Sequence, residues 1–192
     1  MTQALYLLGW LACVVYATIP AFWLLIHPRT DFWRSRRRSP YLILLPMWIM
    51  AWIILGSVTS RWRHATLYTT PWTWAPAILL FSIGLWIYAQ SAKYFSPTQL
   101  GGLPEVLPHH EDQRLVTTGI RSRVRHPIYL GHFCEMLAWS LGTGLTVCYA
   151  LTMFAVLTGT LMIRLEDREL TQRFGEEYRA YREKVPALLP RI

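Results

Sequence analysis

Long apolar runs constrain the fold of this chain more than any other feature of its sequence. A helix needs about 20 consecutive apolar residues to cross the hydrocarbon core of a bilayer. Three runs of this length lie at residues 4–26, 41–60 and 72–90. Charged residues make up only 16% of the sequence, below the roughly 25% that is usual in a soluble domain. The sequence therefore predicts an all-α integral membrane protein.

A fourth apolar stretch covers residues 128–163, which is too long for one span. Gly142, Thr143 and Gly144 divide it near its middle and form a natural turn. We expect two helices here, at about residues 127–141 and 145–163. The whole chain is then a single membrane domain, 1–192, with five transmembrane helices.

Two polar segments remain, a loop at residues 91–126 and a tail at 164–192. A third polar segment, the loop at residues 27–40, joins the first two spans. With five spans, all three polar segments emerge on the same side of the membrane. Together they hold 17 of the 19 Lys and Arg residues. The other side has only Arg61 and Arg63. Basic residues accumulate on the cytoplasmic side of membrane proteins. The sequence therefore predicts an outside N-terminus and a cytoplasmic C-terminus. The net charge of +8 indicates membrane lipid as a partner, and we expect no binding of nucleic acid.

The candidate functional residues lie where the loop and the tail meet the membrane. Pro127 suits the first turn of a helix, so His126 lies at a helix N-terminus, whose N–H groups favour an anion. Glu166 follows the fifth apolar helix directly and is expected at the same depth as His126. The alternative for His126 is a structural residue at the membrane interface.

The tail has an amphipathic pattern, and we expect a C-terminal amphipathic helix that begins near residue 164. Its first turn carries Glu166, Asp167 and Glu169, where acidic side chains suit the helix dipole. Asp167 is expected on the solvated side of this helix.

Glu135 is the only acidic residue within an apolar span, so it must face the helix bundle or a cavity. His132 precedes it by three residues on the same helix face. One such pair supplies too few ligands for a metal, so we expect a buried hydrogen-bonded pair and no metal site. The three cysteines lie in apolar segments and are expected to pack there.

A set of ordered motifs resembles the isoprenylcysteine carboxyl methyltransferase family, which is related to the membrane phospholipid N-methyltransferases. The motifs are Leu115-Val116-Thr117-Thr118-Gly119, Arg125-His126-Pro127-Ile128-Tyr129-Leu130-Gly131, Glu166-Asp167 and Phe174-Gly175-Glu176-Glu177-Tyr178. The likeness covers roughly the C-terminal half of the chain.

The resemblance implies a methyltransferase that uses S-adenosylmethionine, held by the cytoplasmic loop and the amphipathic helix, with a lipophilic or small acceptor (a carboxylate, thiol or amine). The cofactor-binding positions that it implies are Gln113, Arg114, Leu115, Val116, His126, Pro127, Ile128, Tyr129 and Glu166. His126 and the helix start would take the methionine carboxylate, and Glu166 the sulfonium or the ammonium. Glu166 and Arg164 are the catalytic candidates.

The sequence departs from the family pattern at two positions. Arg121 stands where the family often has Tyr. Met162 stands where eukaryotic members have a substrate-associated Arg, so Arg164 would have to replace it. Two other functions stay open, an NADPH-dependent reductase of the sterol reductase type and a non-enzymatic lipid-binding protein.

Overall fold

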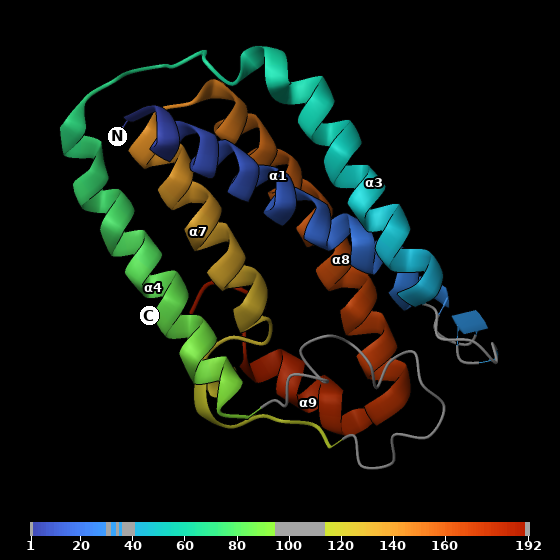
Figure 1. Cartoon of the computed structure of the whole chain (residues 1–192). Coiled ribbons are helices and arrows are strands. Elements are labelled where there is room, and N and C mark those ends of the chain that lie inside the picture. Colours follow the sequence, from blue (N-terminus) through green and yellow to red (C-terminus); the bar gives the residue numbers. More distant parts are fainter. Residues whose placement is uncertain (1, 30–31, 34, 36–40, 95–113, 191–192) are drawn as a thin grey trace.

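The computed structural model describes residues 2–29, 32–33, 35, 41–94 and 114–190, and within them it is helical with no β-strand. Four helices are long and apolar enough to cross a membrane, which makes the chain a multi-pass membrane protein (Figure 1). They contain α1 (Thr2–Ile26), α3 (Tyr41–Thr59), α4 (Trp74–Ala92) and α8 (Thr146–Phe174). The fifth expected span, α7 (Pro127–Thr143), has 17 residues. The count of five spans therefore stays a prediction.

Helices α7 and α8 form the expected hairpin. Gly144 adopts a left-handed conformation with φ 66°, which glycine accepts at little cost. The connection between α3 and α4 closes over this turn, because Leu67 N–H donates to the carbonyl oxygen of Gly144 at 2.8 Å and Thr146 N–H to that of Ala65 at 2.9 Å. The hairpin returns the chain to the level at which α7 begins.

One expected boundary is wrong. The helix that was expected to end at residue 163 continues without a break to Phe174, so the acidic cluster at residues 166–169 lies within α8 and not at a helix start. Loss of hydropathy ends an apolar run, but it does not end a helix of residues with good helix propensity. The break comes at Gly175, with φ 57°, and the short helix α9 (Glu176–Lys184) follows.

The core of the bundle forms around α1, which contacts α3, α7 and α8. Buried apolar side chains of α1, α7 and α8 make one cluster, which includes Cys13, Met136, Cys148 and Leu151. The cysteines of this cluster are buried free thiols, and Cys134 is a partly exposed one. Helix α3 contacts α1 through hydrogen bonds as well, because Trp48 and Trp52 both donate to the Thr18 hydroxyl at 2.8 Å.

Glu135 is buried within the bundle, but its partner is not His132. Tyr16 of α1 donates to one Glu135 carboxylate oxygen at 3.4 Å, and His132 pairs with the Tyr88 hydroxyl of α4 at 2.6 Å. The two residues share a helix face, yet neighbouring helices supply a closer partner to each. The second Glu135 oxygen has no hydrogen-bond partner among the described residues and lies against Gly84.

This close approach leads to a stability prediction for Gly84. A Cβ atom at this position would lie 2.9 Å from Glu135 Cγ and 3.2 Å from the carbonyl oxygen of Gly131, so the buried Glu135 side chain must shift and α4 must move slightly from α7. We expect Gly84→Ala to destabilise the protein by about 1–3 kcal/mol. Gly56→Ala is the matched control, because no atom lies within 4 Å of its Cβ position. Equal thermal unfolding temperatures of the two variants would contradict the predicted clash.

Candidate functional site

The candidate site lies at the end of the bundle that carries α9 (Figure 1). His126 immediately precedes α7, and the chain segment after α9 holds it in place. The backbone N–H groups of Arg125 and His126 donate to the carbonyl oxygens of Pro186 and Ala187 at 2.9 and 3.0 Å. The C-terminal segment therefore fixes the residues that open α7.

The His126 imidazole lies between two consecutive carboxylates of α8. Its Nδ1 atom is 3.3 Å from a Glu166 carboxylate oxygen, and its Nε2 atom is 3.0 Å from a carboxylate oxygen of Asp167. His126 is 4% exposed, so both contacts are shielded from water. The expectation that Glu166 lies at the depth of His126 agrees with this geometry. With both ring nitrogens on carboxylates, His126 positions Glu166 and leaves no ring nitrogen for the carboxylate of a cofactor.

Asp167 is buried, so its expected place on a solvated helix face is wrong. Its carboxylate accepts hydrogen bonds from the Arg125 guanidinium at 2.7 Å and from the Tyr178 hydroxyl, in addition to the His126 contact. Asp167 therefore joins the start of α7, the end of α8 and α9. It continues the buried face of α8 that includes Ala155, Gly159 and Ile163.

Arg125 stabilises the same junction from the other side. Its guanidinium donates to the carbonyl oxygens of Arg182 at 3.1 Å and Val185 at 2.5 Å, where α9 ends. A cation suits a helix C-terminus, where carbonyl groups lack partners within the helix. Sequence reasoning missed this role of Arg125, although the residue belongs to the Arg-His-Pro motif.

The environment of His126 favours its charged form. Burial alone lowers the pKa of the imidazole, but the Glu166 charge and the hydrogen bond to Asp167 outweigh burial, and the pKa rises above its ordinary value of 6.5. With an acidic group at each ring nitrogen, the imidazolium fits the site better than the neutral ring.

This shift predicts a pH dependence of stability. Because the folded chain raises the pKa of His126, the stabilisation is complete below pH 6.5 and is lost as the pH rises through the raised value. The groups that face the imidazole are Glu166 and Asp167, with Arg125 and Tyr178 bound to Asp167. We expect the thermal unfolding temperature to fall from pH 6 to pH 9, and less so in His126→Gln. Equal slopes for the two proteins would contradict the assignment.

The other implied cofactor residues lie at different distances from this centre. The Tyr129 ring is 6.3 Å from the His126 ring, between centroids, and Pro127 and Ile128 open α7 beside it. Leu115 packs on the apolar cluster of Tyr178, Tyr181 and Val185. Val116 is partly exposed, Arg114 is exposed, and Gln113 lies outside the described residues.

Arg164, the second catalytic candidate, is not brought to this centre. It is exposed on α8, two residues before Glu166. Residues two apart on a helix point to nearly opposite sides. The structure thus brings His126 and Glu166 together and leaves Arg164 on another face.

The groups present fit a ligand that carries a cation. The Glu166 side chain is 19% exposed, whereas those of His126 and Asp167 are 2% and 7% exposed. Glu166 is therefore the carboxylate of the cluster with the largest open surface. A cation suits this partly exposed carboxylate, because an ammonium can donate a charge-assisted hydrogen bond to it and a sulfonium attracts it by charge.

Fold and site together define a multi-pass helical membrane protein with a histidine–carboxylate cluster at one end of the bundle. Residues 72–177, more than half of the chain, match the family described as phospholipid methyltransferase. The chain belongs to this family. No solved structure matches the chain.

Several curated proteins are similar to parts of the sequence. The protein-S-isoprenylcysteine O-methyltransferase of Schizosaccharomyces pombe is 36% identical over 90 residues, which cover 43% of this chain and 36% of that protein. The human protein of the same name is 38% identical over 87 residues, which cover 41% of this chain and 28% of that protein. Methanethiol S-methyltransferase 1 of Bradyrhizobium diazoefficiens is 30% identical over 141 residues, which cover 67% of this chain and 48% of that protein. The chain thus spans less than half the length of these relatives.

Proposed function

We propose that this protein transfers a methyl group from S-adenosylmethionine to a lipophilic or small acceptor at the membrane. Its family membership and the names of its relatives, which are O- and S-methyltransferases, support this reaction class. They favour a carboxylate oxygen or a thiol sulfur as the acceptor atom. The observation that carries the proposal is the position of Glu166, partly open and held by His126 where an apolar helix bundle meets polar chain.

The residues of this chain act by binding and positioning. The cofactor supplies an activated methyl group on a positively charged sulfur. Glu166 would hold that sulfonium or the ammonium of the cofactor, and His126 fixes the direction of the Glu166 carboxylate. Methyl transfer is an in-line displacement, so its rate depends on aligning the acceptor atom with the methyl group and the sulfur of the donor. Asp167 and Arg125 hold the loop, α8 and α9 together around that position.

A methyl-transfer assay with the purified full chain tests the proposal. Labelled S-adenosylmethionine is offered with a farnesylcysteine carboxylate or with methanethiol, and the methylated product is identified by mass spectrometry. We expect label in at least one product and saturable calorimetric binding of the cofactor. Saturable NADPH binding alone would indicate a reductase, and binding of neither cofactor would indicate a lipid-binding protein.

We further propose a cytoplasmic C-terminus and an outside N-terminus. The charge asymmetry of the sequence supports this orientation. Arg63 lies just after η2 (Ser60–Trp62), which follows α3, and Arg179 lies in α9. The end of α3 and helix α9 lie at opposite ends of the bundle (Figure 1). We expect cysteines placed at these two positions to be labelled from opposite sides of the membrane by an impermeant reagent. Labelling of both from the same side would overturn the topology.

A further inference from the structure

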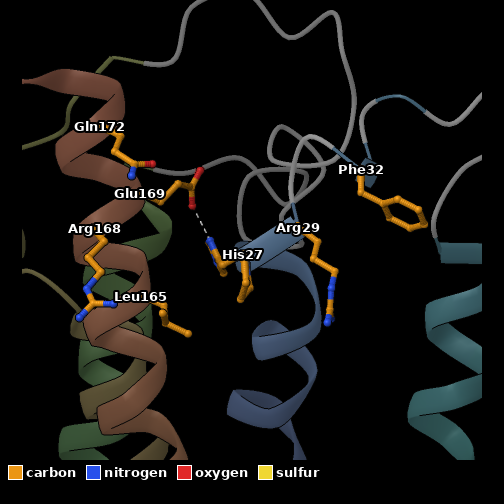
Figure 2. A pocket seen from close by; sticks show the side chains of 8 residues that line it. His27, Arg29, Phe32, Leu165, Arg168, Glu169 and Gln172 are labelled. Atoms are coloured by element: carbon orange, nitrogen blue, oxygen red, sulfur yellow. Dashed lines mark hydrogen bonds and ion pairs between the residues drawn. The ribbon is translucent and has the colours of Figure 1, made fainter.

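A polar cavity lies beside α8, away from Asp167. It has a volume of about 460 Å³ and is bounded by η1 (His27–Arg29), Phe32 and α8 (Figure 2). Its α8 residues are Leu165, Arg168, Glu169 and Gln172. Their spacing places them on one helix face, whereas Asp167 points away from that face. The cavity therefore opens on another face of α8 than Asp167, and its His27 lies near enough to Glu166 to interact with that carboxylate.

A short contact between His27 and Glu169 lines this cavity. His27 is 8% exposed, and its Nδ1 atom lies 2.6 Å from a Glu169 carboxylate oxygen. Figure 2 shows the two side chains facing each other between η1 and α8. This contact ties η1 to α8. Arg173 is a positive group 3.9 Å from the same carboxylate and offsets part of its charge.

The rim of the cavity carries a net positive charge. Arg29 and Arg168 line it from η1 and α8, and both are exposed. Neither has an acidic partner within salt-bridge distance among the residues that the structure describes. The guanidinium group is a planar donor that binds phosphate oxygens through two parallel hydrogen bonds. The charge of the cavity therefore suits a phosphate group.

Apolar surface runs from the cavity along α8. Leu165 lines the cavity, and Leu161, Leu157 and Phe154 continue the same side of the helix toward the middle of the bundle. These three side chains are 50%, 65% and 44% exposed. The cavity itself lies where the apolar runs of α1 and α8 end, which is the level of lipid headgroups. A polar, positive cavity above an apolar strip matches a phospholipid with its headgroup above its acyl chain.

We propose that the cavity between η1 and α8 binds a phospholipid of net negative charge, with its phosphate at Arg29 and Arg168 and an acyl chain along the exposed strip of α8. The Arg residues select anionic over zwitterionic headgroups, because a zwitterionic lipid brings its own cation to a positive rim. This site does not depend on methyl transfer, and a protein without that activity would still bind the lipid.

Thermal unfolding of the purified full chain in neutral detergent tests this site. The probes are phosphatidylglycerol, phosphatidylcholine and glycerol phosphate, each titrated against the wild type. We expect saturable stabilisation by phosphatidylglycerol and at least tenfold weaker apparent binding of the other two. Equal binding of phosphatidylcholine would overturn the charge selectivity. Equal binding of glycerol phosphate would replace the lipid with a soluble anion and overturn the proposal.

Paired variants separate this site from general surface charge. Arg29→Gln with Arg168→Gln removes two positive charges from the cavity, and Arg123→Gln with Arg179→Gln removes two from other exposed positions. We expect the first pair to weaken phosphatidylglycerol binding at least tenfold and the second less than twofold. Unfolding temperatures without lipid show whether each variant folds. An equal loss of binding in both pairs would show attraction to the surface as a whole and overturn the proposed site.

Discussion

Replacing Asp167 with Asn is expected to lower the thermal unfolding temperature by about 6–20 °C. The substitution leaves the guanidinium of Arg125, 7% exposed, without its carboxylate partner and weakens the contacts of Tyr178 and His126. Removing one partner of a buried ion pair costs about 3–5 kcal/mol, and a protein of this size loses roughly 2–4 °C for each kcal/mol. Scanning calorimetry or intrinsic fluorescence of the protein in detergent measures this loss.

Glu177→Gln is the control for this prediction. Glu177 also carries a carboxylate in the C-terminal region, but it is exposed on α9. Substitutions of this kind on a surface usually change stability by less than about 0.5 kcal/mol. A shift of less than 2 °C in Asp167→Asn, similar to that of the control, would show that the buried network is not what holds α7, α8 and α9 together.

The sequence predicts the helical architecture well, because length and hydropathy dominate the behaviour of a chain in a membrane. The apolar runs that begin near residues 4, 41 and 72 correspond to α1, α3 and α4, and the glycines at 142 and 144 locate the hairpin. These features are local. Each follows from a short stretch of sequence without knowledge of the neighbouring helices.

Partners across the bundle were harder to predict, because they depend on helix rotation and on where a helix ends. Glu135 and His132 share a helix face, but each forms a hydrogen bond with a residue of another helix. Glu135 pairs with Tyr16, and His132 pairs with Tyr88. Asp167 was expected in water because the apolar run stops at residue 163. The buried positions 155, 159 and 163 recur every four residues, and this spacing leads to Asp167 once the helix is known to continue.

The proposed cofactor site makes its strongest prediction at Glu166. We expect Glu166→Ala to weaken S-adenosylmethionine binding by at least tenfold while the protein still folds. A hydrogen bond to a charged group contributes about 1.5–3 kcal/mol, which corresponds to roughly ten- to 150-fold in affinity. The Glu166 side chain is the more exposed carboxylate of the cluster, and Asp167 retains its contacts with His126 and Arg125 in this variant. Stability should therefore change less than in Asp167→Asn.

His126→Ala is expected to weaken binding of the same cofactor by at least tenfold, but through a different cause. Its imidazole lies 3.3 Å from the Glu166 carboxylate and orients it. In the variant the Glu166 carboxylate is no longer oriented, and no direct contact between residue 126 and the cofactor is removed. Two readouts separate the causes. Calorimetric affinity should fall in both variants. The decline of unfolding temperature from pH 6 to pH 9 should be smaller than in the wild type in Glu166→Ala, which keeps only the Asp167 contact of His126, and should be smallest in His126→Ala. Near-normal cofactor affinity in both variants would remove the site assignment and leave the helical fold without an assigned cofactor site.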